Sequence, residues 1–458
     1  MTDLDLSRAW LVDPAGEREG PGEIVVRDGI LESVTWLDGR DAEGVDDTGV
    51  VVAPGFVDLH AHLREPGNEE AETIASGLAA AAHGGFTTVC AMPNTSPPID
   101  DPAVVDRIHA LAASSGSPVR LLAYGCVTTG RGGDALAPLG ELADAGVIGF
   151  SDDGAPVHVT PLLRNALAYA GALDLPVVDH AEDPSLTSGA EAHDGLVATV
   201  LGLRGWPSAA EESAVARDLA VLADVRRDVP NARLHLTHLS TAGALDLVRR
   251  ARSVGLPVTC DVTPHHLALS DAWLAGSRRY AWLAEGGDPW TDDTISDRPY
   301  ASSLRVNPPL RTPADAAACL AALADGTADA VATDHAPHRD VDKAVEFGLA
   351  ANGIAGLETA LGLLLEAVDA GRVTLRRVIE SLTIGPARVL GHRLARTPGL
   401  VEGEPADLVV FDRAERWTVA PETLATRDRN TPLLGRRLPG AVLVTIASGR
   451  LAYQSEPS

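Results

Sequence analysis

Apolar segments alternate along most of this chain between short runs typical of buried strands and longer Ala- and Leu-rich runs typical of helices. Eight strand–helix units over about 300 residues predict an α/β fold, a (β/α)8 barrel of the TIM type, with a doubly wound parallel sheet as the alternative. The eight strand candidates are residues 55–63, 87–94, 120–127, 147–154, 176–183, 233–240, 257–265 and 330–338.

The two ends of the chain show a different pattern, in which short strands are separated by turns. Because the termini of a domain often lie close together, we expect both ends to form one small β-sandwich domain. Its predicted bounds are residues 1–53 plus 397–458, and the barrel is predicted over residues 54–396.

One strand carries the most informative motif, which runs from Asp58 through His60 and His62 to Arg64. Side chains alternate between the two faces of a strand, so His60 and His62 are expected to point the same way. Two imidazoles on one side of a strand can hold one metal ion. Arg64 has the same parity, and a guanidinium beside a metal indicates a substrate that carries a carboxylate.

Ligand-type residues also end four further strand candidates. In a (β/α)8 barrel the active site is built at the carboxyl ends of the strands, so these groups are expected to converge. Histidines combined with carboxylates favour zinc, with manganese and cobalt as alternatives. His235 precedes His238 by an odd number of residues and is expected to face the helices. The strand-end candidates are His60 and His62 on the first strand, Asp152 or Asp153 on the fourth, His180 on the fifth, His238 on the sixth and Asp334 on the eighth.

Composition limits the classes of partner. The net charge of −27 argues against nucleic acid and anionic membranes. We find no segment that resembles a signal peptide or a membrane span, and therefore expect a cytoplasmic location. A local cluster of cationic groups can still bind a small anionic substrate. The only lysine is Lys343.

Seven motifs resemble those of the dihydroorotase family, in its long type I bacterial form within the amidohydrolase superfamily. The resemblance extends from about residue 7 to about residue 454, and the motifs together are far more specific than the His-x-His pair alone. It implies reversible hydrolysis of (S)-dihydroorotate to N-carbamoyl-L-aspartate, with ring closure as the direction used in pyrimidine biosynthesis. The motifs are DLHAHLREPG, GGFTTVCAMPNT, GFSDDG, VTPHHL, VNPPLR, ATDHAPH and GIAGLET.

The resemblance implies one or two Zn²⁺ ions per subunit, two being favoured, and it supplies the ligand set. Asp153 is expected to bridge the two ions, where many relatives use a carboxylated lysine, because Lys343 lies after the eighth strand. Asp334 is expected both to ligate metal and to move a proton to and from the reacting amide. The expected ligands are His60, His62, Asp153, His180, His238 and Asp334.

Four residues resemble the family's contacts to substrate. Arg64, Asn94 and His338 are expected to clamp the α-carboxylate, since Arg can donate two hydrogen bonds to it. Asn307 matches a position that contacts the pyrimidine ring, although Asn94 and Asn307 could each be a turn residue. We expect His265 and His266 to orient ligands without touching metal.

Two stretches depart from the family pattern. A long segment at residues 268–304 could be an active-site lid, a subunit contact or a surface loop. Ala351-Asn352-Gly353 stands where relatives have Pro-Phe-Gly, which leaves the contacts to the ring edge open.

Two other functions compete with the leading hypothesis. A dihydropyrimidinase- or allantoinase-type cyclic amidase is disfavoured, because such enzymes generally use a lysine carbamate and lack the Arg64 and Asn94 clamp. A catalytically inactive scaffold for aspartate transcarbamoylase is disfavoured because the whole ligand set is present. We expect a homodimer, and association with aspartate transcarbamoylase stays open.

Overall fold

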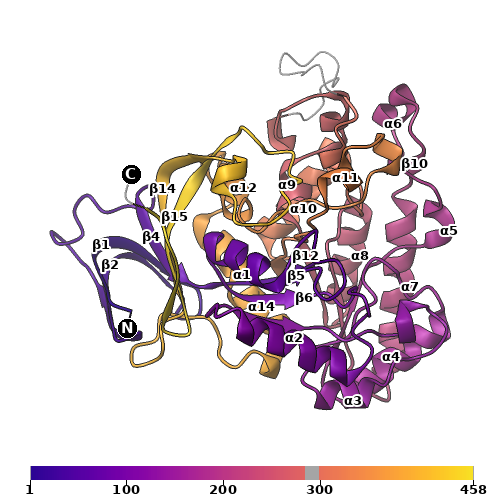
Figure 1. Ribbon diagram of the computed structural model, residues 1–458, viewed down its shortest axis with the longest axis horizontal. Coiled ribbons are helices and arrows are strands. Elements are labelled where there is room, and N and C mark those ends of the chain that lie inside the picture. The colour runs from indigo at the N-terminus through magenta and orange to yellow at the C-terminus, as the bar shows by residue number, and fades with distance from the viewer. Residues whose placement is uncertain (1, 284–298, 457–458) are drawn as a thin grey trace.

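The computed structural model describes residues 2–283 and 299–456. Parallel strands and surrounding helices make up most of the molecule, and a separate β-sheet packs against one side (Figure 1). Within the described ranges, no helix combines the length and apolar character needed to span a membrane.

Two parallel sheets form the centre of the α/β part. One has the order β5-β6-β7 and the other the order β13-β12-β11-β8. The strands are β5 (Phe56–Ala61), β6 (Phe86–Ala91), β7 (Arg120–Ala123), β8 (Pro176–Asp179), β11 (Arg233–Leu236), β12 (Val258–Val262) and β13 (Ala330–Val331).

Single parallel bridges connect the two sheets at both ends. Phe150 bridges to Gly125, just after β7, and to Val177 in β8. On the opposite side Ala61 in β5 bridges to His335, just after β13. Seven of the eight strand candidates thus contain a parallel strand, whereas the fourth is reduced to the bridges at Phe150, because the chain turns at Asp153-Gly154.

Helices follow most of these strands and cover their outer faces (Figure 1). Several begin at a threonine whose hydroxyl accepts a hydrogen bond from a free backbone N–H of the first turn: Thr73, Thr241 and Thr312. The longer helices are α1 (Ile74–His83), α2 (Pro102–Ser114), α4 (Thr160–Ala172), α7 (Ala209–Val225), α8 (Ala242–Ser253), α10 (Pro313–Asp325), α12 (Ala360–Asp369), α13 (Leu375–Leu382) and α14 (Ile384–Leu390). Shorter elements are α3 (Leu139–Asp144), α5 (Pro184–Thr187), α6 (Leu196–Leu201), α9 (Pro264–Ala268), α11 (Asp340–Lys343), β9 (Ala192–His193) and β10 (Gly205–Trp206).

Alternate residues of the parallel strands belong to different apolar clusters. Val57, Leu59, Cys90, Tyr124 and Val178 are buried in a cluster on the inner face of the strands. Residues of the opposite parity pack with the helices in the main core. This alternation follows from the two-residue period of a strand and fills the centre with side chains.

Strands from both ends of the chain form one seven-stranded sheet, in the order β16-β15-β14-β4-β1-β2-β3. The strand β4 joins the two ends, because it pairs parallel with β1 and antiparallel with β14. All seven strands are thus hydrogen-bonded into one continuous sheet, and the expected arrangement of this sheet in two layers stays a prediction. The strands are β1 (Leu4–Asp13), β2 (Arg18–Arg27), β3 (Ile30–Trp36), β4 (Val50–Pro54), β14 (Leu408–Thr418), β15 (Arg437–Ala447) and β16 (Arg450–Gln454).

The flanks of the long segment at residues 268–304 pack into the protein. Trp273 and Trp282 are buried, and the rings of Tyr280 and Trp282 stack with centroids 4.8 Å apart. The Arg436 guanidinium lies 4.8 Å from the centre of the Trp273 ring. Residues 284–298 lie outside the described residues, so the choice between lid, subunit contact and loop stays a prediction.

We predict that Leu408→Ala lowers the free energy of unfolding by about 2–5 kcal/mol, because it leaves a cavity in the core of the terminal sheet. Leu408 is fully buried there beside Leu11 and Ile24. Leu451→Ala is the matched control in the same sheet, where the side chain is 46% exposed. Denaturant titration measures the free energy of unfolding of both variants. An equal decrease in the two would contradict the predicted packing role of Leu408.

Candidate active site

The imidazoles of His60 and His62 converge at the carboxyl end of β5. Their Nε2 atoms are 3.2 Å apart. Asp334, which follows β13, places Oδ1 3.1 Å from His62 Nε2 and 3.6 Å from His60 Nε2. Three ligand-type groups from two neighbouring strands thus surround one point, where a metal ion could bind.

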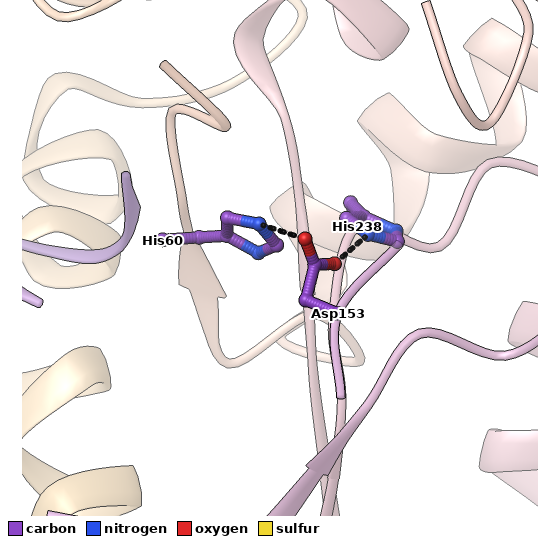
Figure 2. A group of neighbouring side chains, drawn as sticks. All are labelled: His60, Asp153 and His238. Carbon is purple, nitrogen blue, oxygen red and sulfur yellow. Dashed lines mark hydrogen bonds and ion pairs between the residues drawn. The ribbon is translucent and has the colours of Figure 1, made fainter. Parts of the chain in front are cut away.

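Asp153 connects this group with a second one. Its Oδ2 lies 3.4 Å from the Nε2 atoms of both His60 and His62. Its Oδ1 lies 3.3 Å from His180 Nδ1 and from His238 Nε2. Figure 2 shows the Asp153 carboxylate between His60 and His238, so one oxygen faces each group.

The neighbouring carboxylate of Asp152 faces elsewhere. It accepts hydrogen bonds from the backbone N–H groups of Val127 and Thr128 and from the Thr128 hydroxyl. The chain turns at Asp153-Gly154, so Asp152 and Asp153 face different partners and only Asp153 reaches the histidines.

Burial and charge together define the protonation of these groups. All six ligand candidates are at most 6% exposed. Burial favours the neutral form of Asp153, but His60, His180 and His238 outweigh it and hold the pKa of Asp153 well below its usual range. Burial likewise opposes the charge on His60, yet Asp153 and Asp334 raise the pKa of His60 to about 9. The Asp153 carboxylate is therefore ionised and can act as a ligand.

Three site residues have a left-handed backbone. The φ angles of Arg64, His238 and Asp334 are 62°, 41° and 45°. A positive φ is energetically costly for non-glycine residues, and residues with this backbone conformation are found preferentially at functional sites. It also changes the direction of the side chains where each strand ends, so that strand parity no longer applies beyond that point.

The expectation that His235 faces the helices is wrong for this reason. His235 is in register with Val178 of the inner cluster, and its Nε2 lies 2.7 Å from Asp261 Oδ2. The alternation holds along β11 but ends before His238, which has a positive φ. Both histidines therefore lie on the inner side.

Asp261 contacts the metal-ligand candidate His238 directly and His60 through Thr237, a role that was not predicted from the sequence. Its Oδ1 accepts the backbone N–H of His238 at 2.6 Å. The Thr237 hydroxyl lies 3.2 Å from Asp261 Oδ2 and 2.9 Å from His60 Nδ1. The signal in the sequence was a carboxylate inside the apolar strand β12, since a buried charge needs partners.

The four predicted substrate residues Arg64, Asn94, Asn307 and His338 line one cavity of about 220 Å³ beside these groups. Arg64 Nη2 lies 3.0 Å from His338 Nε2. Asn94 Oδ1 lies 2.9 Å from His62 Nδ1, so the Asn94 carbonyl oxygen can accept that proton and leave Nε2 free. Asn307 Nδ2 donates to Glu182 Oε2 at 3.1 Å.

Further residues line or support this cavity and were not predicted. Arg131 lines it and donates from Nη2 to the Asp153 carbonyl. Asn352 and Gly353, from the stretch that departs from the family pattern, also line it. Asn430, near the C-terminus, accepts the backbone N–H of His338 at 2.9 Å and donates to the Gly353 carbonyl at 2.9 Å. Only tertiary structure brings Asn430 here, because nothing in its local sequence marks it.

Lys343 bonds to backbone carbonyls and not to the ligand candidates. Its Nζ donates to the carbonyls of Ser302, Arg305 and Ala351 at 3.1, 3.1 and 2.7 Å. Burial lowers the pKa of Lys343 to about 7, and Arg305 and Arg64 add to this effect. The chain's single lysine is thus held by backbone carbonyls.

His265 and His266 are buried on α9 and belong to neither group of possible metal ligands. His266 Nδ1 lies 2.8 Å from the Thr263 hydroxyl, and its Nε2 lies 3.0 Å from the Pro308 carbonyl. Since Pro308 follows Asn307, His266 supports the loop that carries Asn307.

Solved structures with a similar fold include a hydantoinase and a dihydropyrimidinase. An L-hydantoinase (dihydropyrimidinase) from Arthrobacter aurescens superposes with a TM-score of 0.79 at 22% identity, over 100% of this chain and 97% of that one. A dihydropyrimidinase from Brevibacillus agri superposes with a TM-score of 0.75 at 20% identity, over 99% of this chain and 95% of that one. At these identities the likeness defines the fold class.

Sequence comparison defines the family. A family model described as dihydro-orotase-like matches residues 49–241. A dihydroorotase of Anaeromyxobacter dehalogenans is 46% identical over 459 residues, covering 100% of this chain and 99% of the relative. A dihydroorotase of Syntrophotalea carbinolica is 42% identical, covering 98% of each chain. The chain belongs to the dihydroorotase family.

Proposed function

We propose that this chain catalyses the reversible hydrolysis of (S)-dihydroorotate to N-carbamoyl-L-aspartate. The observation that carries the proposal is the arrangement of Asp153 and Asp334 among four imidazoles, next to a cavity lined by Arg64. Family membership and this arrangement support the same activity.

We also infer that the two parallel sheets close into one (β/α)8 barrel over residues 54–396, with a β-domain from residues 1–53 plus 397–458. The bridges at Phe150 and between Ala61 and His335 support closure, because they join the free edges of both sheets. The candidate site then lies at the carboxyl ends of the strands, where such barrels place their active sites.

The donor set fits a pair of zinc ions. His60, His62 and Asp334 form one group and His180 and His238 the other, with one Asp153 oxygen facing each. Imidazole and carboxylate are suitable ligands for zinc. Asp153 would hold both ions, since Lys343 Nζ is engaged with three backbone carbonyls. When bound, zinc would supply a Lewis acid that polarises the ring carbonyl and makes water more acidic.

Asp334 is the group that would move the proton. His62 and His60 outweigh burial and hold the pKa of Asp334 below its usual range, so its carboxylate is ionised and can accept a proton from the attacking water. Asp334 would then donate that proton to the ring nitrogen as the amide bond breaks. In ring closure Asp334 would take the proton from the attacking nitrogen.

Arg64, Asn94 and His338 would hold the α-carboxylate. Arg64 has its guanidinium at the cavity and is fixed by hydrogen bonding of its Nε to the Pro337 carbonyl at 3.0 Å. A charged clamp of this kind favours a carboxylated ring over an uncarboxylated one, because only the former can pair with the guanidinium.

Removal of zinc should abolish turnover. We expect chelator-treated protein to regain activity on adding about two zinc equivalents per chain. Zinc at one hundred times its dissociation constant should stabilise the fold by about 2.7 kcal/mol. Metal analysis measures the zinc content per chain, and thermal unfolding measures the stabilisation by zinc. His180→Ala should bind less zinc, whereas His392→Ala, with a side chain 53% exposed outside the site, should bind the normal amount.

Asp334→Asn should lower kcat by about 10²- to 10⁴-fold, because the amide cannot accept the proton. Zinc should stay bound, since His60, His62 and Asp153 remain. Single-turnover kinetics combined with metal analysis tests this, and a rate close to that of the wild type would rule out the proton-transfer role.

Arg64→Met should raise the KM for dihydroorotate roughly 10- to 100-fold with unchanged zinc content, because a charge-assisted hydrogen bond is lost. Wild-type protein should strongly prefer dihydroorotate to dihydrouracil, which lacks the carboxylate, and the variant should lose most of this preference. Arg204→Met, with a side chain 65% exposed, is the control. A wild-type preference for dihydrouracil would favour the dihydropyrimidinase-type alternative.

A further inference from the structure

Glu182 lies between a metal-ligand candidate and a substrate-binding candidate. It follows β8 and is only 9% exposed. Its Oε2 lies 3.0 Å from His180 Nε2 and 3.1 Å from Asn307 Nδ2. The other oxygen, Oε1, accepts a hydrogen bond from the Thr187 hydroxyl, so both oxygens of this buried carboxylate are engaged.

The first contact determines which nitrogen of His180 can bind metal. An ionised carboxylate only accepts hydrogen bonds, so a neutral His180 facing Glu182 carries its proton on Nε2. The lone pair is then on Nδ1, which lies 3.3 Å from Asp153 Oδ1 and 3.0 Å from His238 Nε2. Nδ1 is the atom that faces the second ligand group.

The second contact determines the orientation of the Asn307 amide. Only the NH₂ group of the amide can donate to Glu182, so the carbonyl oxygen Oδ1 occupies the other position. Oδ1 is buried, and no donor in residues 2–283 and 299–456 bonds to it. A buried acceptor without a partner is unfavourable, and Asn307 lines the cavity in which an N–H of the substrate could supply the donor.

We propose that Glu182 is a positioning residue that fixes two groups of the site with one carboxylate. It holds the proton of His180 on Nε2, so that Nδ1 can bind metal, and it turns the Asn307 carbonyl oxygen toward an N–H of the substrate ring. The second half rests on the proposed function, whereas the first half concerns metal binding alone.

Zinc affinity tests the first half. The isosteric Glu182→Gln keeps the shape of the side chain but removes its negative charge. The hydrogen bonds from His180 and Asn307 are then no longer strengthened by a charged acceptor. We expect the zinc dissociation constant to rise about 10- to 100-fold in a competition titration with a chromogenic chelator on full-length apoprotein. An unchanged constant would overturn this role of Glu182.

Asp183→Asn is the matched control for that titration. It makes the same carboxylate-to-amide change one residue away, where Asp183 caps α5 and is bonded to Ser185. Its zinc dissociation constant should stay within about twofold of the wild type. A weakening equal to that of Glu182→Gln would show a general effect of lost charge and would overturn the proposal.

A mutant cycle at saturating zinc tests the second half. Asn307→Ala and Glu182→Gln should each raise the KM for dihydroorotate roughly 2- to 10-fold, and Asn307→Ala should leave zinc affinity unchanged. In the double variant the two effects on KM should not add, because both act through one contact. Additive effects would overturn the link between Glu182 and Asn307.

A second, more conservative variant tests the same role if Glu182→Gln does not fold. Thr187→Val removes only the hydroxyl that holds Oε1, and should raise the zinc dissociation constant about threefold. If either variant folds and its zinc dissociation constant equals that of the wild type, the proposal is overturned. If wild-type protein did not turn over dihydroorotate, the proposed function would fail, while the zinc titrations would still decide the role of Glu182.

Discussion

The structure of the site depends on one buried carboxylate, that of Asp153, which faces two groups of imidazoles at once. Four histidines in such a small volume cannot all carry charge without repulsion, and burial further disfavours the charged forms. The Asp153 carboxylate offsets both effects. In the fourth strand region only Phe150 pairs with its neighbours, and the chain then turns at Asp153-Gly154, with Asp153 facing the histidines and Asp152 bonded to Thr128.

This arrangement needs strands that are far apart in sequence to end at the same rim. The bridge between Ala61 and His335 brings the first and the last strand regions together, and with them His62 and Asp334. Left-handed backbone at Arg64, His238 and Asp334 then turns the side chains inward beyond the strand ends. At His238 the buried Asp261 carboxylate, which accepts the His238 backbone N–H, helps to maintain this costly conformation.

The terminal sheet and the α/β part are linked at the site itself. Asn430 is separated from His338 by 92 residues, yet it holds the backbone of His338 and of Gly353 at the cavity wall. Thr426, from the same segment, donates to the buried Glu72. The C-terminal segment therefore contributes to the geometry of the cavity as well as to the sheet.

Local patterns in the sequence were sufficient for seven of the eight parallel strands and for the shared direction of His60 and His62. The preference for Asp153 over Asp152 as a metal ligand rested on a motif and stays a prediction. These features follow from periodicity and from motifs that are short in sequence. The roles of Glu182, Asp261 and Asn430, the inward direction of His235 and the single terminal sheet were decided only by tertiary structure. The physical reason is that strand parity ends where the backbone turns, and that hydrogen bonds between distant segments leave no periodic trace in the sequence.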